Sequence, residues 1–130
     1  MSYTIKNLRD IEDVAPGFGF DEVQEARFAL RDLDSETVGL AFHRVKPGKR
    51  QAFAHRHEEA EEIYVVLSGS GRIKLDDDVQ PVAEMDAIRV APAVLRAFEA
   101  GPDGLELIVF GPHHQGDGEV ISEDFWGERS

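Results

Sequence analysis

Short apolar runs separated by turn residues dominate the chain from Val38 to Phe110. Within the runs, apolar and polar residues alternate with the two-residue period of β-strands, and glycine, proline or aspartate follows most of them. Ser68–Gly71 and Gly101–Gly104 are rich in glycine and predict tight turns. This spacing, with no helical pattern between the runs, predicts an all-β antiparallel sandwich or barrel. The predicted strands are Val38–Val45, Gln51–His57, Ile63–Leu67, Arg72–Leu75, Val79–Val82, Ala87–Val90, Val94–Glu99 and Leu105–Phe110.

The first third of the chain has a weaker pattern. Tyr3–Leu8 is compatible with a strand, and a break follows at Ala15–Gly19. From Ala26 to Leu30 a strand period and a helical stripe compete, and the strand is the better reading. We therefore expect an all-β domain with an N-terminal segment of less definite structure and a short C-terminal tail.

Length and composition restrict the class of protein. The 130 residues fit one domain, 1–130, with its core at about 38–110. Cysteine is absent, so packing alone must hold the chain together. With 26 acidic and 14 basic residues, the net charge of −12 disfavours binding to nucleic acid or to anionic membranes. We find no signal-peptide pattern and no run long enough to span a bilayer, so a cytoplasmic location is expected.

Two histidines and one glutamate form the pattern with the clearest chemistry. His55 and His57 are two residues apart in a predicted strand, so both imidazoles project to the same face. Glu62 follows after an acidic turn, at the head of the next strand. Two imidazoles and one carboxylate suit Fe(II), Mn(II), Zn(II) or Ni(II) and leave positions open for a substrate. Glu61 is the less suitable carboxylate because its side chain would face the other way.

Turn glycines flank this group in a recognisable order. Gly48, six residues, His55-x-His57, four residues, Glu62, six residues and Gly69 resemble the first motif of the cupin superfamily. The run Met85-Asp86-Ala87-Ile88-Arg89-Val90-Ala91-Pro92 resembles its second motif. Within this superfamily, the chain most resembles a group of small bacterial cupins. The resemblance implies an antiparallel, jelly-roll-like barrel, but cupins support many different chemistries.

The sequence departs from the cupin pattern at the position of a fourth metal ligand. Metal-binding cupins usually place a histidine there, and this chain has Arg96. Arginine keeps its charge and cannot ligate a metal. Three arrangements are open: Arg96 pairs with Glu62, binds the carboxylate or phosphate of a ligand, or turns to solvent. Tyr64 and Phe98 share strand faces with Glu62 and Arg96, and His43 lies in the preceding strand, so all three are expected in the pocket wall.

Three functions agree with this pattern. The preferred one is a small cupin that binds a small polar ligand, such as a carboxylate, in the barrel, with a divalent metal at His55, His57 and Glu62. The alternatives are a metal-dependent dioxygenase or isomerase and a metal-free binding or structural module. Ile63–Leu67 is apolar on both faces, and a small barrel exposes one of them to water. We therefore expect a homodimer that covers this outer face.

Overall fold

The computed structural model describes residues 2–121 and 125–127, and all of its strand pairings are antiparallel. Two short 3₁₀ helices, η1 (Leu8–Asp10) and η2 (Pro16–Phe18), precede the strands. No helix among these residues is long and apolar enough to cross a membrane. The strands are β1 (Gln24–Phe28), β2 (Val38–Val45), β3 (Ala54–His57), β4 (Glu62–Leu75), β5 (Asp78–Ala83), β6 (Ala87–Val90), β7 (Arg96–Pro112) and β8 (Gly118–Ile121).

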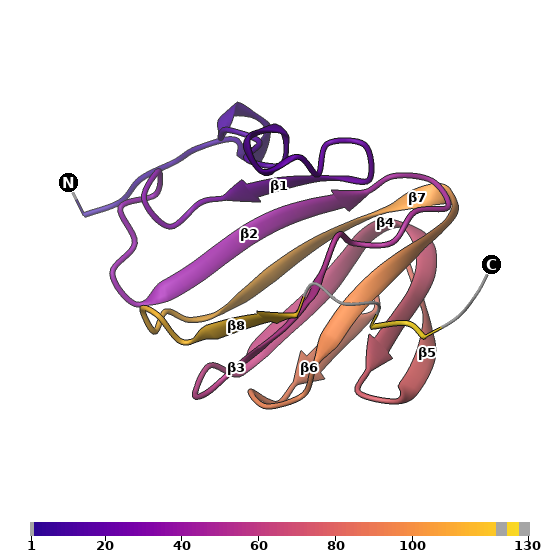
Figure 1. The fold of residues 1–130 in the computed structure, drawn as a ribbon. Coiled ribbons are helices and arrows are strands. Elements are labelled where there is room, and N and C mark those ends of the chain that lie inside the picture. The colour runs from indigo at the N-terminus through magenta and orange to yellow at the C-terminus, as the bar shows by residue number, and fades with distance from the viewer. Residues whose placement is uncertain (1, 122–124, 128–130) are drawn as a thin grey trace.

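The strands form one curled sheet around the long strand β7 (Figure 1). β7 pairs with β2, β3 and β4, and β4 pairs in turn with β5 and β6. A sheet that curls on itself encloses one face and exposes the other, so alternate residues of each strand point inward. The all-β prediction and the antiparallel architecture are confirmed.

The interior follows this alternation. Tyr64, Val66 and Ile73 of β4 are at most 2% exposed, and Phe98 and Leu107 of β7 are fully buried. Each such side chain stabilises the fold by roughly 1.5–3 kcal/mol relative to an exposed position. The intervening residues of β4 are more exposed, as Leu67 at 42% shows. Period-two alternation therefore decides which side chains line the barrel.

The predicted turns at Ser68–Gly71 and Gly101–Gly104 are wrong. β4 and β7 each run through the glycine-rich segment, with irregularities in their register between Val66 and Gly71. At Gly69, which has a φ of +82°, an added Cβ would lie 2.0 Å from the carbonyl oxygen of Gly104. The glycines therefore serve the close approach and bending of two long strands, which is a role of β-bulges.

The N-terminal predictions are partly corrected. Residues 2–7 form no strand, and at Leu8 the 3₁₀ helix η1 begins. The side chain of Asn7 caps this helix by accepting a hydrogen bond from the Arg9 backbone N–H at 2.9 Å, which favours the helical turn. The strand expected at Ala26–Leu30 exists as β1 but begins at Gln24 and ends at Phe28.

The segment after β7 also contains a strand that the sequence pattern does not predict. β8 pairs with β3, placing Gly118 opposite His57 and Val120 opposite His55. Further on, Trp126 is 7% exposed and packs with Ala54 and Ala97. The end of the described chain is thus packed against β3, the strand that carries both histidines. The predicted strand at Gln51–His57 is shorter in the structure, because β3 begins at Ala54. The predicted strands Val94–Glu99 and Leu105–Phe110 are instead joined in the single long strand β7, which runs from Arg96 to Pro112.

Candidate metal and ligand site

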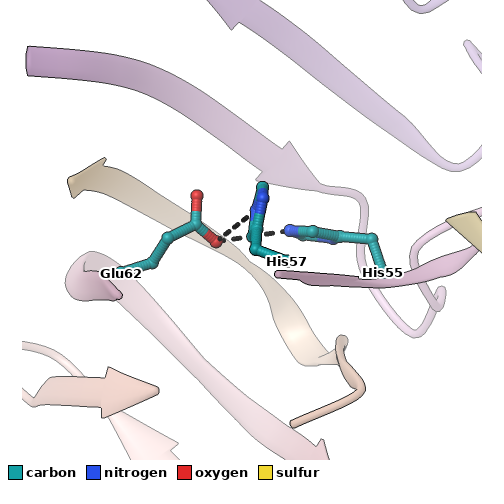
Figure 2. Close-up of side chains that lie close together, drawn as sticks. All are labelled: His55, His57 and Glu62. Carbon is teal, nitrogen blue, oxygen red and sulfur yellow. Dashed lines mark hydrogen bonds and ion pairs between the residues drawn. The ribbon is translucent and has the colours of Figure 1, made fainter. Parts of the chain in front are cut away.

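Two strands that do not pair with each other bring the three candidate ligands together. His55 and His57 lie on β3 and Glu62 opens β4, with one loop between them. Both His Nε2 atoms are 3.3 Å from the same carboxylate oxygen, Oε1 of Glu62 (Figure 2). One ligand atom from each residue lies within 4.8 Å of the other two, and this is the only such group among residues 2–121 and 125–127.

The donor set fits a divalent transition metal. It offers two imidazole nitrogens and one carboxylate oxygen from one side, which leaves coordination positions for water or a ligand. His57 Nε2 is buried and, despite its 3.3 Å approach to Glu62, has no hydrogen bond of acceptable geometry among the described residues. A buried polar atom without a partner costs free energy, which a metal ligand bond would recover. Glu61 pairs instead with Arg89 at 3.0 Å on the exposed surface.

Glu62 is held as a carboxylate. Burial of its side chain opposes ionisation, but the close polar contacts with His55 and His57, and the charge of these imidazoles when they are protonated, outweigh burial and hold the pKa of Glu62 well below its usual range. The hydroxyl of Tyr64 donates a further hydrogen bond to Oε1 at 3.0 Å. Tyr64 itself stays protonated, because burial and then the charge of Glu62 raise its pKa.

Arg96 lies inside the barrel beside this group. Its side chain is 1% exposed, so the arrangement in which it turns to solvent is not the one in the structure. Nη1 donates to the carbonyl oxygens of Val94 at 2.8 Å and Pro92 at 3.2 Å, while Nη2 lies 3.5 Å from Glu62 Oε1. Nε and Nη2 are buried without hydrogen bonds among the described residues. The guanidinium therefore has a fixed position and pairs with Glu62, and two of its nitrogens still have hydrogen-bond capacity to offer.

The expected wall residues have separate environments. Phe98 is fully buried, and its ring centroid is 5.1 Å from that of Tyr64. His43 on β2 shares the inward face of Ala41 and Val45, and its Nδ1 is buried with no hydrogen bond among the described residues. Burial, with a smaller contribution from His55, lowers the pKa of His43 to about 4, although Glu62 opposes this shift. His43 is thus a neutral imidazole near the candidate site.

Sequence reasoning missed one residue at the site, Asp117. Its carboxylate lies in the turn before β8, with Oδ2 3.5 Å from Nδ1 of His57. A pocket of about 540 Å³ opens beside this contact, lined by residues 56–58, Ala93 and residues 116–119. No local pattern marks Asp117, because it reaches His57 only through the pairing of β8 with β3.

Comparison with known protein families agrees with the fold and the motif. Residues 41–110 match the model of the cupin domain family. The chain belongs to the cupin family. The matched segment contains the three candidate ligands and Arg96 but ends before Asp117. A search of curated proteins gives no significant match.

Solved cupin structures superimpose on most of the chain. A cupin protein from Bacteroides fragilis (BF4112) aligns with a TM-score of 0.69 at 20% identity, covering 95% of this chain and 96% of its own. The polyketide cyclase RemF from Streptomyces resistomycificus gives 0.73 at 19% identity, with 95% and 89% covered. An oxalate decarboxylase variant from Bacillus subtilis gives 0.72 at 21% identity, with 91% of this chain but 33% of its own covered. At these identities the likeness establishes the fold.

Proposed function

We propose that this cupin binds a small carboxylate-bearing molecule in its barrel, over a divalent metal held by His55, His57 and Glu62, with Arg96 as the ligand's counter-charge. The observation that carries the proposal is the burial of Arg96. Its guanidinium is 1% exposed, Nη2 forms an ion pair with Glu62 at 3.5 Å, and neither Nη2 nor Nε makes a hydrogen bond among the described residues. Donors of this kind bind carboxylates in a fixed geometry.

The charges of the site call for an anion. Two neutral imidazoles and one carboxylate leave a divalent ion with one positive charge, and Arg96 adds a second. Two positive centres a few ångströms apart in a poorly hydrated barrel repel each other unless an anion lies between them. A ligand carboxylate that contacts both the metal and Arg96 would relieve this repulsion. The metal would polarise the bound ligand.

The structural neighbours are compatible with this ligand class, since one of them is named for its action on oxalate, a dicarboxylate. Another is named as a polyketide cyclase, so the same fold supports different substrates. A metal-dependent dioxygenase or isomerase acting on a small carboxylate is the enzymatic form of the proposal. The site residues would be those already named, with the ligand entering above the open face of the His55, His57 and Glu62 group.

A metal-free binding module is the second candidate, and one observation favours it. Glu62 Oε1 already accepts a hydrogen bond from Tyr64 and lies within 3.5 Å of His55, His57 and Arg96. The carboxylate is therefore largely satisfied by the protein's own donors. In this function Arg96 and the histidines would bind the ligand anion directly, and Glu62 would position them.

Calorimetric titration of Zn(II), Ni(II) and Mn(II) tests the metal. We expect His57→Ala to abolish uptake and Arg96→His to strengthen it, because a neutral donor replaces a fixed like charge. Unchanged affinity in His57→Ala would place the metal elsewhere. No uptake by wild type or by Arg96→His would leave the metal-free module as the function.

Titration of succinate, which chelates metals weakly, tests the ligand with and without Zn(II). Arg96→His should weaken succinate binding at least tenfold while metal affinity rises, so the two effects have opposite signs. Arg89→His is the matched control, because Arg89 pairs with Glu61 on the surface and should leave both affinities unchanged. Equal succinate binding by wild type and Arg96→His would refute the assigned role of Arg96.

A further inference from the structure

Asp117 connects the two strands that carry the candidate ligands. Its Oδ1 accepts the backbone N–H groups of Glu58 at 2.5 Å and Glu59 at 3.0 Å, and its Oδ2 accepts that of Ala60 at 2.9 Å. These three residues belong to the loop, residues 58–61, between β3, which ends at His57, and β4, which begins at Glu62. One buried carboxylate, 5% exposed, therefore fixes the loop that sets the distance between the ligands.

The same carboxylate faces the imidazole of His57. Oδ2 lies 3.5 Å from Nδ1, across the ring from Nε2, which faces Glu62 at 3.3 Å. Both ring nitrogens are buried and neither makes a hydrogen bond among the described residues, so Oδ2 of Asp117 acts on Nδ1 as a nearby negative charge. The backbone of Gly118, the next residue, lies against this ring, because an added Cβ there would be 3.6 Å from Cε1 of His57. A histidine that binds a metal through Nε2 needs its proton on Nδ1, and a carboxylate at Nδ1 stabilises that tautomer.

Glu62 competes poorly for this proton. Its Oε1 already accepts a hydrogen bond from Tyr64 at 3.0 Å and is approached by His55 Nε2 at 3.3 Å and Arg96 Nη2 at 3.5 Å. A carboxylate oxygen has two lone pairs, so a further donor gains little there. Oδ2 of Asp117 has one backbone donor, from Ala60, and can accept a second. The proton of His57 is therefore more stable on the side of Asp117.

We propose that Asp117 is a positioning residue of the metal site: it holds the proton of His57 on Nδ1, turns the Nε2 lone pair toward the metal, and ties down the loop between β3 and β4. This inference rests on the proposed metal site. Asp117 lies outside the segment 41–110 that matches the cupin family, because it belongs to the turn before β8. The C-terminal strand thus has a role in the site besides extending the sheet.

Asp117→Asn tests the tautomer directly. The side-chain NH₂ must replace one of the two oxygens. In the Oδ1 position it would meet two backbone N–H groups, and in the Oδ2 position only that of Ala60. The second placement is the less repulsive, and it turns a donor toward Nδ1 of His57, which favours the Nε2–H tautomer. That tautomer has no lone pair for the metal, so affinity should fall about 10- to 100-fold.

Two measurements are made on wild type and on Asp117→Asn. Long-range ¹H–¹⁵N spectra of the imidazole rings, at about pH 9 where an ordinary histidine is neutral, report the tautomer, with His57→Ala assigning the signals. Zn(II) calorimetry reports affinity. Asp13→Asn is the matched control, because Asp13 also accepts two backbone N–H groups, from Ala15 and Ala26. Wild type and Asp13→Asn should both show Nδ1–H and equal affinity.

Several results would overturn the proposal. One is an Nε2–H or doubly protonated His57 in the wild-type protein, which decides the matter even if Asp117→Asn does not fold. Another is an Asp117→Asn variant that loses stability but keeps wild-type Zn(II) affinity, since Asp117 would then only brace the loop. If wild type takes up no metal, the proposed metal site is refuted, and with it the role of Asp117 in metal binding. An Nδ1–H tautomer in that metal-free protein would show only that Asp117 stabilises the proton on Nδ1 of His57.

Discussion

Acid should destabilise this protein through His43 in a defined pH window. Burial, together with the nearby His55, lowers the pKa of His43 from 6.5 to about 4, and its Nδ1 has no hydrogen-bond partner among the described residues. The unfolded chain therefore binds a proton at His43 that the folded protein does not accept between these two pH values. The corresponding stability is complete above about pH 6.5 and is lost as the pH falls toward 4.

The size of the effect follows from the two pKa values. At about 1.4 kcal/mol for each pH unit, the window from 6.5 to about 4 corresponds to at most about 3 kcal/mol. Below pH 4 the loss due to His43 should stop, because both states are then protonated. His43→Leu removes the titrating group and should remove this part of the pH dependence. Its stability at pH 7 can differ from that of wild type without affecting the comparison.

Urea denaturation at a series of pH values, with a chelator present, measures the effect. Between pH 7 and 4 the free energy of unfolding of wild type should fall by up to about 3 kcal/mol more than that of His43→Leu. His113→Leu is the matched control, because His113 is exposed and its removal should leave the wild-type slope. Parallel curves for wild type and His43→Leu would refute the reasoning and show that His43 titrates normally in the folded protein.

Two further predictions concern packing and assembly. Gly69→Ala should cost at least about 3 kcal/mol of stability, because the new Cβ would lie 2.0 Å from the carbonyl oxygen of Gly104. Gly19→Ala is the control: Gly19 has a similar φ of +79° but open space around it, so this change should cost about 1 kcal/mol. Equal losses of stability in chemical denaturation would contradict the packing argument. We also predict a homodimer that covers the outer face of β4, where Leu67 is 42% exposed. Light scattering at micromolar protein concentration tests this prediction, and a measured mass of 14.5 kDa, that of the monomer, would exclude the dimer.

The sequence by itself determined the fold class and the placement of His55 and His57 on the same face of a strand. Period-two alternation identifies which residues of β4 and β7 point inward, because that pattern depends only on local backbone geometry. The same rule places His55 and His57 on one face. The motif spacing then indicates the cupin barrel, and the family match over 41–110 confirms it.

The tertiary structure decided the features that depend on contacts between distant segments. Glycines at 69 and 104 looked like turns, because local composition cannot distinguish a turn from a close approach of two strands. Whether Arg96 faced solvent or Glu62 depended on the pairing of β7 with β3 and β4. Asp117 stands 60 residues after His57 in the chain, and only the pairing of β8 with β3 brings the two side chains together.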